Sequence, residues 1–333
     1  MWPVKFVDAL DTDAHTRPYV RIGRVVNRLG FFLMRQHYAS TTIANSIRQV
    51  IHALRSDDDA LAENTAVLAE RRRRDEARIA RALGHELKGL DVLIIGPGPY
   101  LVEPRFFGRH NDVTAIDLDV IPRGFAPGPY FQMLRQNGLG RFVKTVGRKV
   151  LGVDRRNARA WQRELGVERH AEPRLIQGDI LKGPPRENAY DVVACWSVFQ
   201  HIAEPALAIH HMKAALRPGG VIYIAIHLYT SNTGHHDMRA FTGGADKLPP
   251  WPHLRESTKN EVTSSAWINK WRLRDWRAML NEHAPGFEEY RQIYDEPAER
   301  RLLTPEIRAE LAGFDEEELL TTDVYFLWRK PVS

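Results

Sequence analysis

The sequence predicts an α/β fold built on a doubly wound, mostly parallel sheet. Short Val-, Ile- and Leu-rich runs recur from residue 91 onwards, helix-like segments alternate with them, and glycines or acids directly follow several of the runs. Continuous apolar runs, rather than alternating ones, are typical of parallel strands that helices cover on both faces. The pattern therefore favours a layered sheet over a helical bundle or a β-sandwich.

Composition narrows the class of protein further. The chain has 333 residues, of which 43% are apolar, which suits one large domain with elaborations. The lone Cys195 excludes an internal disulfide framework and a cysteine-based zinc cluster. No apolar run approaches the ~20 residues that span a bilayer, and the first residues lack the pattern of a secretory signal. We therefore expect a cytoplasmic protein without a membrane span.

The elements follow in order along the chain. Residues 1–88 lack strand signals, and 60–87 is rich in strong helix formers, which predicts an N-terminal helical region that serves as a lid or acceptor wall. Residues 89–333 then form the main domain. Its strands are predicted at 91–95, 113–116, 174–177, 191–195, 221–226, 288–294 and 323–328, with a helix at 203–216.

Two insertions exceed what simple crossovers need, and long loops in a compact core are usually functional. The first, 121–170, holds 11 Lys or Arg and three acids, a net +8 in a chain of net charge +5. Such a block either attracts phosphates, nucleic acid or acidic substrates, or forms a solvated helix face. The second, 227–267, is rich in His, Gly, Pro and Trp, and we interpret it as a substrate loop.

A nucleotide-type ligand is indicated where the first two strands end. The first runs into Gly96-Pro-Gly98, whose glycines let the backbone approach a ligand, and the second ends at Asp117, which can accept hydrogen bonds from a ribose diol. Further along, Asp179 and Ile180 follow the third strand, Tyr190-Asp-Val-Val-Ala-Cys-Trp-Ser covers the fourth, and Arg-Pro-Gly-Gly precedes the fifth.

This ordered set, over roughly residues 88–230, resembles the class I S-adenosylmethionine-dependent methyltransferases. The resemblance implies a seven-stranded Rossmann-like methyltransferase sheet with S-adenosyl-L-methionine as cofactor. It implies that Gly96 and Gly98 flank the methionine part, that Asp117 holds the ribose and that Asp179 holds the adenine amino group. Ile180 is expected to pack on the adenine, and Trp196 and Ser197 to line the pocket.

Two positions depart from the family pattern. An acid usually stands where this chain has Ile94, so Glu103 or Asp91 is expected to meet the cofactor's ammonium instead. Tyr100 occupies the usual third glycine position. A nicotinamide-dependent dehydrogenase is the rival class, but it expects a third glycine where this chain has Leu101.

The loop after the fifth strand carries the candidate chemistry. A hydroxyl acceptor must lose its proton, and an imidazole of near-neutral pKa suits a general base. We expect His227, His235 and Asp237 to be catalytic, with a divalent metal on His235, His236 and Asp237 as an alternative. Cys195 is interpreted as an ordinary buried cysteine. The expected substrate contacts are His201, Tyr229, Asn232, His236, Arg255 and Asn269.

These observations predict methylation of oxygen on a small polar or saccharide acceptor, with nucleic acid not expected as a partner. Two alternatives stay open. One is an RNA methyltransferase that uses the basic insertion, in which aromatic residues (Phe125, Tyr130, Phe131, Phe142 and Trp161) lie among the basic ones. The other is a non-catalytic subunit that binds the cofactor, as the departures at Ile94 and Tyr100 suggest. The oligomeric state is not predicted.

Overall fold

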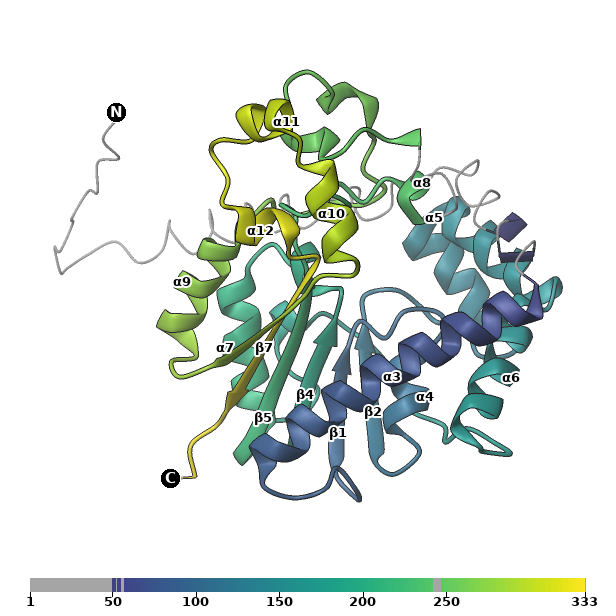
Figure 1. The fold of residues 1–333 in the computed structure, drawn as a ribbon. Coiled ribbons are helices and arrows are strands. Elements are labelled where there is room, and N and C mark those ends of the chain that lie inside the picture. The colour runs from purple at the N-terminus through teal and green to yellow at the C-terminus, as the bar shows by residue number, and fades with distance from the viewer. Residues whose placement is uncertain (1–49, 52, 55–56, 242–246, 333) are drawn as a thin grey trace, which may run out of the picture.

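The computed structural model describes residues 50–51, 53–54, 57–241 and 247–332 (Figure 1). Its centre is a seven-stranded sheet in the order β3-β2-β1-β4-β5-β7-β6. The strands are β1 (Asp91–Ile95), β2 (Asp112–Asp117), β3 (Arg174–Gln177), β4 (Tyr190–Trp196), β5 (Leu216–His227), β6 (Glu288–Gln292) and β7 (Asp323–Arg329). The predicted fold class and all seven predicted strands are confirmed, with small shifts at the strand ends.

The first five strands run parallel to one another, whereas β7 runs antiparallel to both β5 and β6. Because β7 runs the opposite way, its first residue, Asp323, lies in register with His227, the last residue of β5. The carboxyl ends of the parallel strands and the start of β7 therefore meet at one edge of the sheet.

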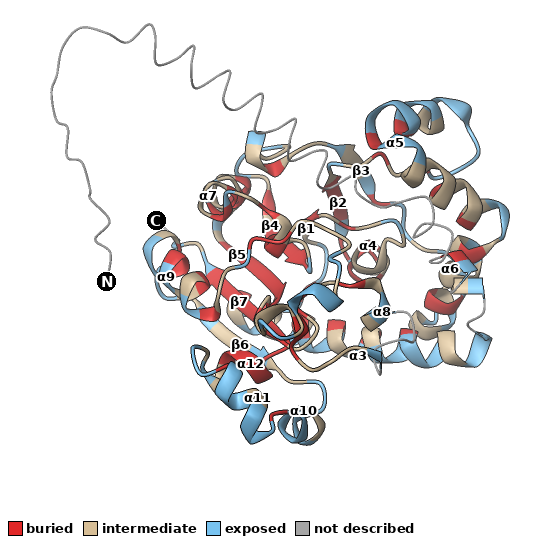
Figure 2. Ribbon diagram, turned by 90° about the horizontal axis from the view of Figure 1, so that it is seen from above, coloured by how far each residue is buried: buried red, intermediate tan, exposed pale blue. Residues whose placement is uncertain are grey.

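Helices cover both faces of the sheet. On one face, α7 (Pro205–Ala215) and α9 (Leu273–His283) share a core with alternate residues of β1, β4 and β5. On the other face lie α3 (Asp58–Leu83), α4 (Val102–Phe107) and α6 (Val153–Leu165) (Figures 1 and 2). Successive strand residues point to opposite faces, so each strand supplies both cores.

Helix α3 is part of this core rather than a separate unit. It begins at Asp57, whose carboxylate accepts a hydrogen bond from the Ala60 N–H at 2.7 Å, and it ends at Gly84 in the left-handed region (φ +84°). Its residues Ala69, Ile79 and Leu83 pack against the sheet. The lid or wall role of residues 1–88 stays a prediction, and residues 1–49 lie outside the described part.

The basic insertion is helical. It forms α5 (Pro127–Val150), which breaks at Gly138 (φ +83°), and α6, whose Trp161 is fully buried against the sheet core. After β5 the chain forms α8 (Met238–Phe241), η4 (Pro252–Leu254) and η5 (Lys259–Glu261). These segments lie near α10 (Glu296–Leu302), α11 (Pro305–Glu310) and α12 (Glu316–Leu320) above the sheet in Figure 1. A small core around Trp251, Leu311 and Leu319 joins the two parts.

Candidate active site

A cavity of about 300 Å³ opens at the carboxyl ends of the parallel strands. Ligands of doubly wound sheets bind in this place. Its lining includes residues from the ends of β1, β2, β3 and β4, and six of them were predicted as site residues from the sequence: Gly96, Gly98, Asp117, Asp179, Ile180 and His201. The structure therefore brings five of the seven predicted cofactor residues together around one cavity.

The turn after β1 requires glycine for two reasons. Both Gly96 and Gly98 have positive φ, +64° and +63°. In addition, a Cβ on Gly96 would lie 2.6 Å from Cγ2 of Val198, which also lines the cavity. The Gly96 N–H donates to the Ile116 carbonyl at 2.8 Å, which fixes the turn against β2. The backbone of Gly96 and Gly98 thus carries no side chain at the point where a ligand can approach it.

Asp117, at the end of β2, is a half-buried carboxylate beside this turn. Burial and the neighbouring Asp119 carboxylate raise its pKa to about 6. The Asp119 N–H donates to Asp117 Oδ1 at 2.8 Å, and the backbone of Gly98 also stabilises the ionised form. A diol that donates two hydrogen bonds would supply the stabilisation that this carboxylate lacks.

Asp179 and Ile180 lie on the far side of the cavity, where β3 leads into η1 (Ile180–Lys182). Asp179 caps this short helix through Oδ1, which accepts from the Leu181 N–H at 2.9 Å. Ile180 is buried and presents an apolar surface to the cavity.

Trp196 and Ser197 do not line the cavity. Trp196 belongs to the opposite face of the sheet, where its indole stacks on Phe107 with ring centroids 5.1 Å apart. Its indole N–H donates to Asp75 on α3 at 2.9 Å. Ser197 is exposed at a left-handed position (φ +53°), and the next residue, Val198, faces the cavity instead.

The two acids considered for the cofactor's ammonium are both engaged elsewhere. Asp91 stands at the start of β1, at the opposite edge of the sheet from Gly96, and pairs with Arg217 at 2.6 Å. Glu103 on α4 is half-buried and pairs with Arg72 at 3.1 Å, and loss of solvent raises its pKa. The expectation for Asp91 is therefore wrong, and Glu103 does not line the cavity.

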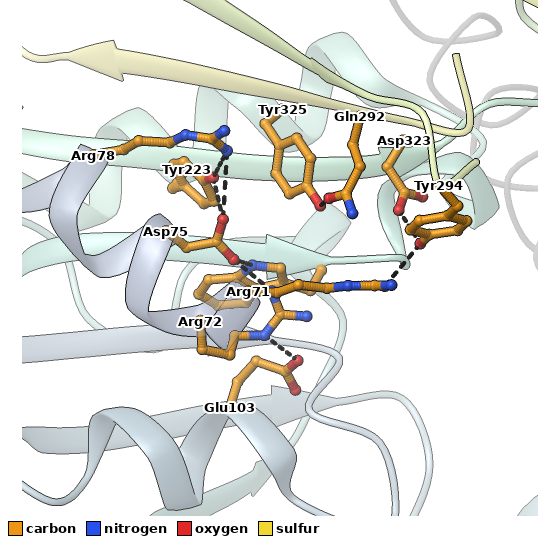
Figure 3. A network of polar contacts seen from close by, with 11 residues as sticks. Arg71, Arg72, Asp75, Arg78, Glu103, Tyr223, Gln292, Tyr294, Asp323 and Tyr325 are labelled. Carbon is orange, nitrogen blue, oxygen red and sulfur yellow. Dashed lines mark hydrogen bonds and ion pairs between the residues drawn. The ribbon is translucent and has the colours of Figure 1, made fainter. Parts of the chain in front are cut away.

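A buried polar network connects α3 with the sheet (Figure 3). The Asp75 carboxylate, 1% exposed, accepts hydrogen bonds from Arg72, Trp196 and Tyr223. Arg78 lies 3.6 Å from the same carboxylate. Three hydrogen-bond donors and a second guanidinium surround this buried carboxylate, and the bonds from Trp196 and Tyr223 fix α3 on β4 and β5.

A second branch of polar contacts reaches the strand-end edge of the sheet. Arg71 on α3 donates to the Tyr294 hydroxyl at 3.0 Å, and that hydroxyl in turn donates to Asp323 Oδ2 (Figure 3). The other carboxylate oxygen of Asp323 lies 3.0 Å from Nδ1 of His227. Asp323 is thereby held on one side by a tyrosine while it contacts the imidazole on the other.

His227 itself is buried at the end of β5, and both ring nitrogens have partners. A carboxylate only accepts, so Nδ1 carries the proton toward Asp323, which leaves Nε2 to accept from the Thr233 hydroxyl 3.0 Å away. This tautomer is inferred from the two partners. An imidazole oriented by a carboxylate, with an unprotonated second nitrogen, is the arrangement of a general base.

Other histidines surround His227. The His236 ring lies 5.1 Å from the His227 ring and 5.1 Å from that of His201, which lines the cavity. Burial and the neighbouring imidazoles lower the pKa of His236 to about 2, and burial lowers that of His201. Both rings are therefore neutral near pH 7. A row of three imidazoles leads from the cavity to Asp323.

His235 and Asp237 have a different environment. Burial lowers the pKa of His235 to about 4, and its Nδ1 accepts from the Asp237 N–H at 2.9 Å. The Asp237 carboxylate is saturated by Arg239 and by the Thr263 N–H, and these hydrogen bonds hold its pKa far below the usual range. Among the described residues no group of three or more His, Cys, Asp or Glu side chains is arranged to hold a metal ion.

Comparison with known families assigns this architecture. The family model for a methyltransferase domain matches residues 127–224, from α5 into β5. This stretch of the chain is a methyltransferase domain. The resemblance seen in the sequence is confirmed, and the sheet order with its antiparallel β7 agrees with it. Domains of this class take their methyl group from S-adenosylmethionine.

The chain is also similar to solved structures, at low sequence identity. Phosphoethanolamine N-methyltransferase 2 of Haemonchus contortus, solved with phosphomonomethylethanolamine and S-adenosylhomocysteine, is 15% identical, with a TM-score of 0.41, over 78% of this chain and 53% of its own. A proposed S-adenosyl-L-methionine-dependent methyltransferase of Methanococcus maripaludis is 12% identical, with a TM-score of 0.42, over 88% and 94%. The chain spans about half the length of the H. contortus enzyme. No curated protein matches the sequence.

Most predicted substrate residues of the methyltransferase lie away from the cavity. The Asn232 Oδ1 accepts from the Trp251 N–H at 2.8 Å, and Arg255 pairs with Glu310 at 2.5 Å. Asn269 is buried and donates to the Ile202 carbonyl at 3.2 Å. The Tyr229 ring packs against His253, 4.8 Å between ring centroids. Of the predicted substrate set, only His201 lines the cavity.

Cys195 is fully buried in the methyltransferase sheet, and burial raises the pKa of its thiol to about 12. A thiol of that pKa is not a nucleophile near neutral pH, which agrees with an ordinary buried cysteine. No helix among the described residues is long and apolar enough to cross a membrane.

Two functional candidates were not found from the sequence. Asp323 is the first residue of the last strand. The antiparallel pairing of that strand with β5 places its first residue beside His227, so the topology could have indicated Asp323. Arg148, which lies on α5 and lines the cavity, had no signal beyond the general basic charge of the insertion.

Proposed function

We propose that the cavity holds S-adenosylmethionine, with its methionine part beside Gly96 and Gly98 and its ribose on Asp117. Asp179 and Ile180 would then meet the adenine. Three observations of the chain support this fit: the turn has no room for a Cβ at Gly96, the half-buried Asp117 carboxylate lines the cavity with a raised pKa, and Ile180 offers an apolar wall. When bound, the cofactor supplies an electrophilic methyl group on a sulfonium sulfur.

The reaction that we propose is methylation of a hydroxyl oxygen on a small polar acceptor, with His227 as general base. The His227–Asp323 pair at the end of β5 carries this proposal. His227 Nε2 would accept the acceptor's hydroxyl proton, and Asp323 would stabilise the protonated ring through Nδ1–H. The bound cofactor would supply the methyl group, whose bond to sulfur breaks with the electron pair left on the sulfur. The acceptor hydroxyl would take the place that Thr233 occupies on Nε2.

The structure supports a broader class of acceptor than the saccharide that the sequence suggested. Arg255 and Asn269, which the sequence suggested as saccharide contacts, instead bind partners within the protein. His201 and His236 remain as proposed walls of the acceptor site, because they lie between the cavity and His227. We therefore propose a small polar acceptor without specifying a sugar.

One observation favours the RNA alternative enough to test it. Phe125 and Phe131, at the start of the basic insertion, are 69% and 68% exposed, whereas Trp161 is fully buried. Exposed aromatics among basic residues suit stacking on single-stranded RNA. Titration with a short RNA at rising salt separates the two functions, since phosphate contacts lose affinity steeply with salt and a neutral acceptor does not.

The general base is tested by His227→Gln. We expect turnover to fall ~10²- to 10⁴-fold, the usual contribution of general base catalysis, with little change in the Kd for S-adenosylhomocysteine. Single-turnover rates and calorimetric titration measure the two quantities. His210→Gln, on the exposed face of α7, is the matched control and should change neither. An unchanged rate in His227→Gln removes the base assignment.

The role of Asp323 in positioning His227 has its own test. Asp323→Asn should lower turnover while the affinity for S-adenosylhomocysteine stays, because the amide can donate to Nδ1 and so favour the wrong tautomer. Tyr294→Phe, which removes only the hydroxyl behind Asp323, should have a smaller effect. If the wild type binds the cofactor but transfers methyl to no acceptor, the non-catalytic alternative gains support.

A further inference from the structure

One side of α5 carries large apolar side chains that face solvent. Phe131, Leu134 and Arg135 lie three and four residues apart, so they share one side of the first half of the helix, and all three are exposed. Met133 and Asn137 lie on the other side, where they are buried and line the cavity. The helix therefore separates the cavity from an apolar surface at the periphery of the molecule (Figure 2).

The break at Gly138 folds the second half of α5 back along the first. The Tyr130 and Phe142 ring centroids are 6.5 Å apart, whereas a continuous helix would separate these positions by about 18 Å. The Lys149 ammonium also donates to the carbonyl of Arg123, which precedes the helix, at 2.8 Å. Further exposed apolar residues lie before the helix and directly after its break. We call the exposed apolar set the α5 face: Phe125, Phe131, Leu134 and Leu139.

Positive charge accompanies the α5 face. Helix α5 has five Lys or Arg residues and no acid. Asp119 and Asp154, from neighbouring segments, pair with three of these bases. Arg135, which lies among the exposed apolar residues, forms no ion pair with any residue that the structure describes. The helix therefore keeps an excess of positive charge beside its apolar surface.

The chain before residue 50 has a similar composition. Residues 17–36 contain five Arg and no acid, together with Phe31, Phe32 and other large apolar residues. The described part begins at Val50, whose side chain lies against Gly147 of α5, 3.6 Å from where a Cβ would stand. Because both segments are basic, neither complements the charge of the other, whereas an anionic surface complements both.

We propose that the α5 face binds an anionic lipid surface. Its phenyl and leucine side chains insert at the boundary between headgroups and acyl chains, while the neighbouring bases contact the lipid phosphates and carboxylates. Apolar insertion and positive charge are the two contributions that reversible binding to a membrane surface combines. Lipid binding does not depend on the proposed reaction, but it would hold the cavity about 10 Å, one helix diameter, from the lipid.

A single-stranded RNA is the competing partner for the same charges. Phe125 and Phe131 could stack on bases, but Leu134 and Leu139 have no ring to stack with, and they are 39% and 53% exposed. Aliphatic side chains gain free energy only by leaving water for an apolar environment, which a bilayer provides. The composition of the α5 face therefore favours lipid over RNA.

Cosedimentation of the full chain with vesicles tests the proposal. One set of vesicles is phosphatidylcholine alone, and the other contains about one-third phosphatidylserine. Phe131→Ser combined with Leu134→Ser removes apolar surface without changing charge, and Val67→Ser, at an exposed site on α3, is the matched control. We expect the wild type and the control to bind the anionic vesicles, and the double variant to bind them about 10- to 100-fold more weakly. Arg135→Gln should weaken binding about fivefold. All of these side chains are exposed, so the variants should melt at the temperature of the wild type.

The proposal is overturned if the wild type sediments with neither kind of vesicle or equally with both, or if the double variant binds as the wild type does. It is also overturned if a short single-stranded RNA binds where vesicles do not, and Phe131→Ser weakens that binding while Leu134→Ser leaves it unchanged. A wild type that ignores vesicles but forms an oligomer that the double variant dissociates in gel filtration would make the α5 face an interface between copies of the chain.

Discussion

Asp117 has to be ionised to accept hydrogen bonds from a diol, and its surroundings oppose ionisation. With a pKa raised to about 6, the carboxylate loses its charge as the pH falls through 6. We expect the affinity for S-adenosylhomocysteine to be constant above pH 7 and to fall by up to about tenfold per pH unit below 6. Calorimetry from pH 8 to 5 measures this. Asp119→Asn removes the like charge and should move the decline to lower pH, whereas a flat profile in the wild type would contradict the ribose role.

Gly96 and Gly98 share a backbone conformation but differ in their surroundings. Both have positive φ, yet only at Gly96 would a Cβ meet a neighbour, the Val198 side chain. Gly96→Ala should therefore cost about 1–3 kcal/mol from the steric clash in addition to the ~1 kcal/mol of strain that Gly98→Ala also carries. Urea unfolding of the two variants provides the comparison. Equal losses would mean that the contact with Val198 relaxes freely.

At the scale of elements, the buried carboxylate of Asp75 fastens α3 to the sheet. Asp75→Asn leaves Arg72 without its charge partner on α3, and breaking a buried ion pair typically costs about 3–5 kcal/mol. Glu70→Gln on the exposed side of the same helix is the control, since surface ion pairs are worth less than about 1 kcal/mol. Urea midpoints test the difference. Similar stabilities of the two variants would show that α3 is held by its apolar contacts alone.

The sequence predicted elements better than it predicted side-chain directions. Apolar runs located the parallel strands β1, β2, β4 and β5 because helices cover such a sheet on both faces, and strand ends located Gly96, Asp117 and Asp179 because the carboxyl ends of parallel strands share one edge. Trp196 could have been placed by counting, since alternation puts it on the face opposite Cys195.

Tertiary contacts could not be predicted from the alternation of residues along a strand. The partners of Arg255 and Asn232 come from segments tens of residues away, and no local pattern indicates that these polar groups are already satisfied. Arg148 looked like any other residue of a basic helix, because burial of one face of α5 depends on how the helix docks beside Asp119 and Tyr100. The fold was therefore predictable, and the acceptor site largely was not.

At the scale of the whole molecule, ligand binding should be visible as stability. A ligand that binds only the folded state at 100 times its Kd adds about 2.7 kcal/mol, which raises the melting temperature by several degrees in a chain of this size. We expect this shift with S-adenosylmethionine and S-adenosylhomocysteine and none with NAD, by differential scanning fluorimetry. Asp117→Ala should abolish it. A shift with NAD alone would revive the dehydrogenase alternative.

The antiparallel pairing of β7 also determines when the enzyme can become competent as it is made. β5 has one neighbour, β4, until residues 323–329 leave the ribosome, about a hundred residues after β5 itself. Until then its second edge is open and His227 has no carboxylate beside it. The same event that closes the sheet therefore delivers Asp323 to the candidate base, so the proposed base is assembled only when the last strand pairs.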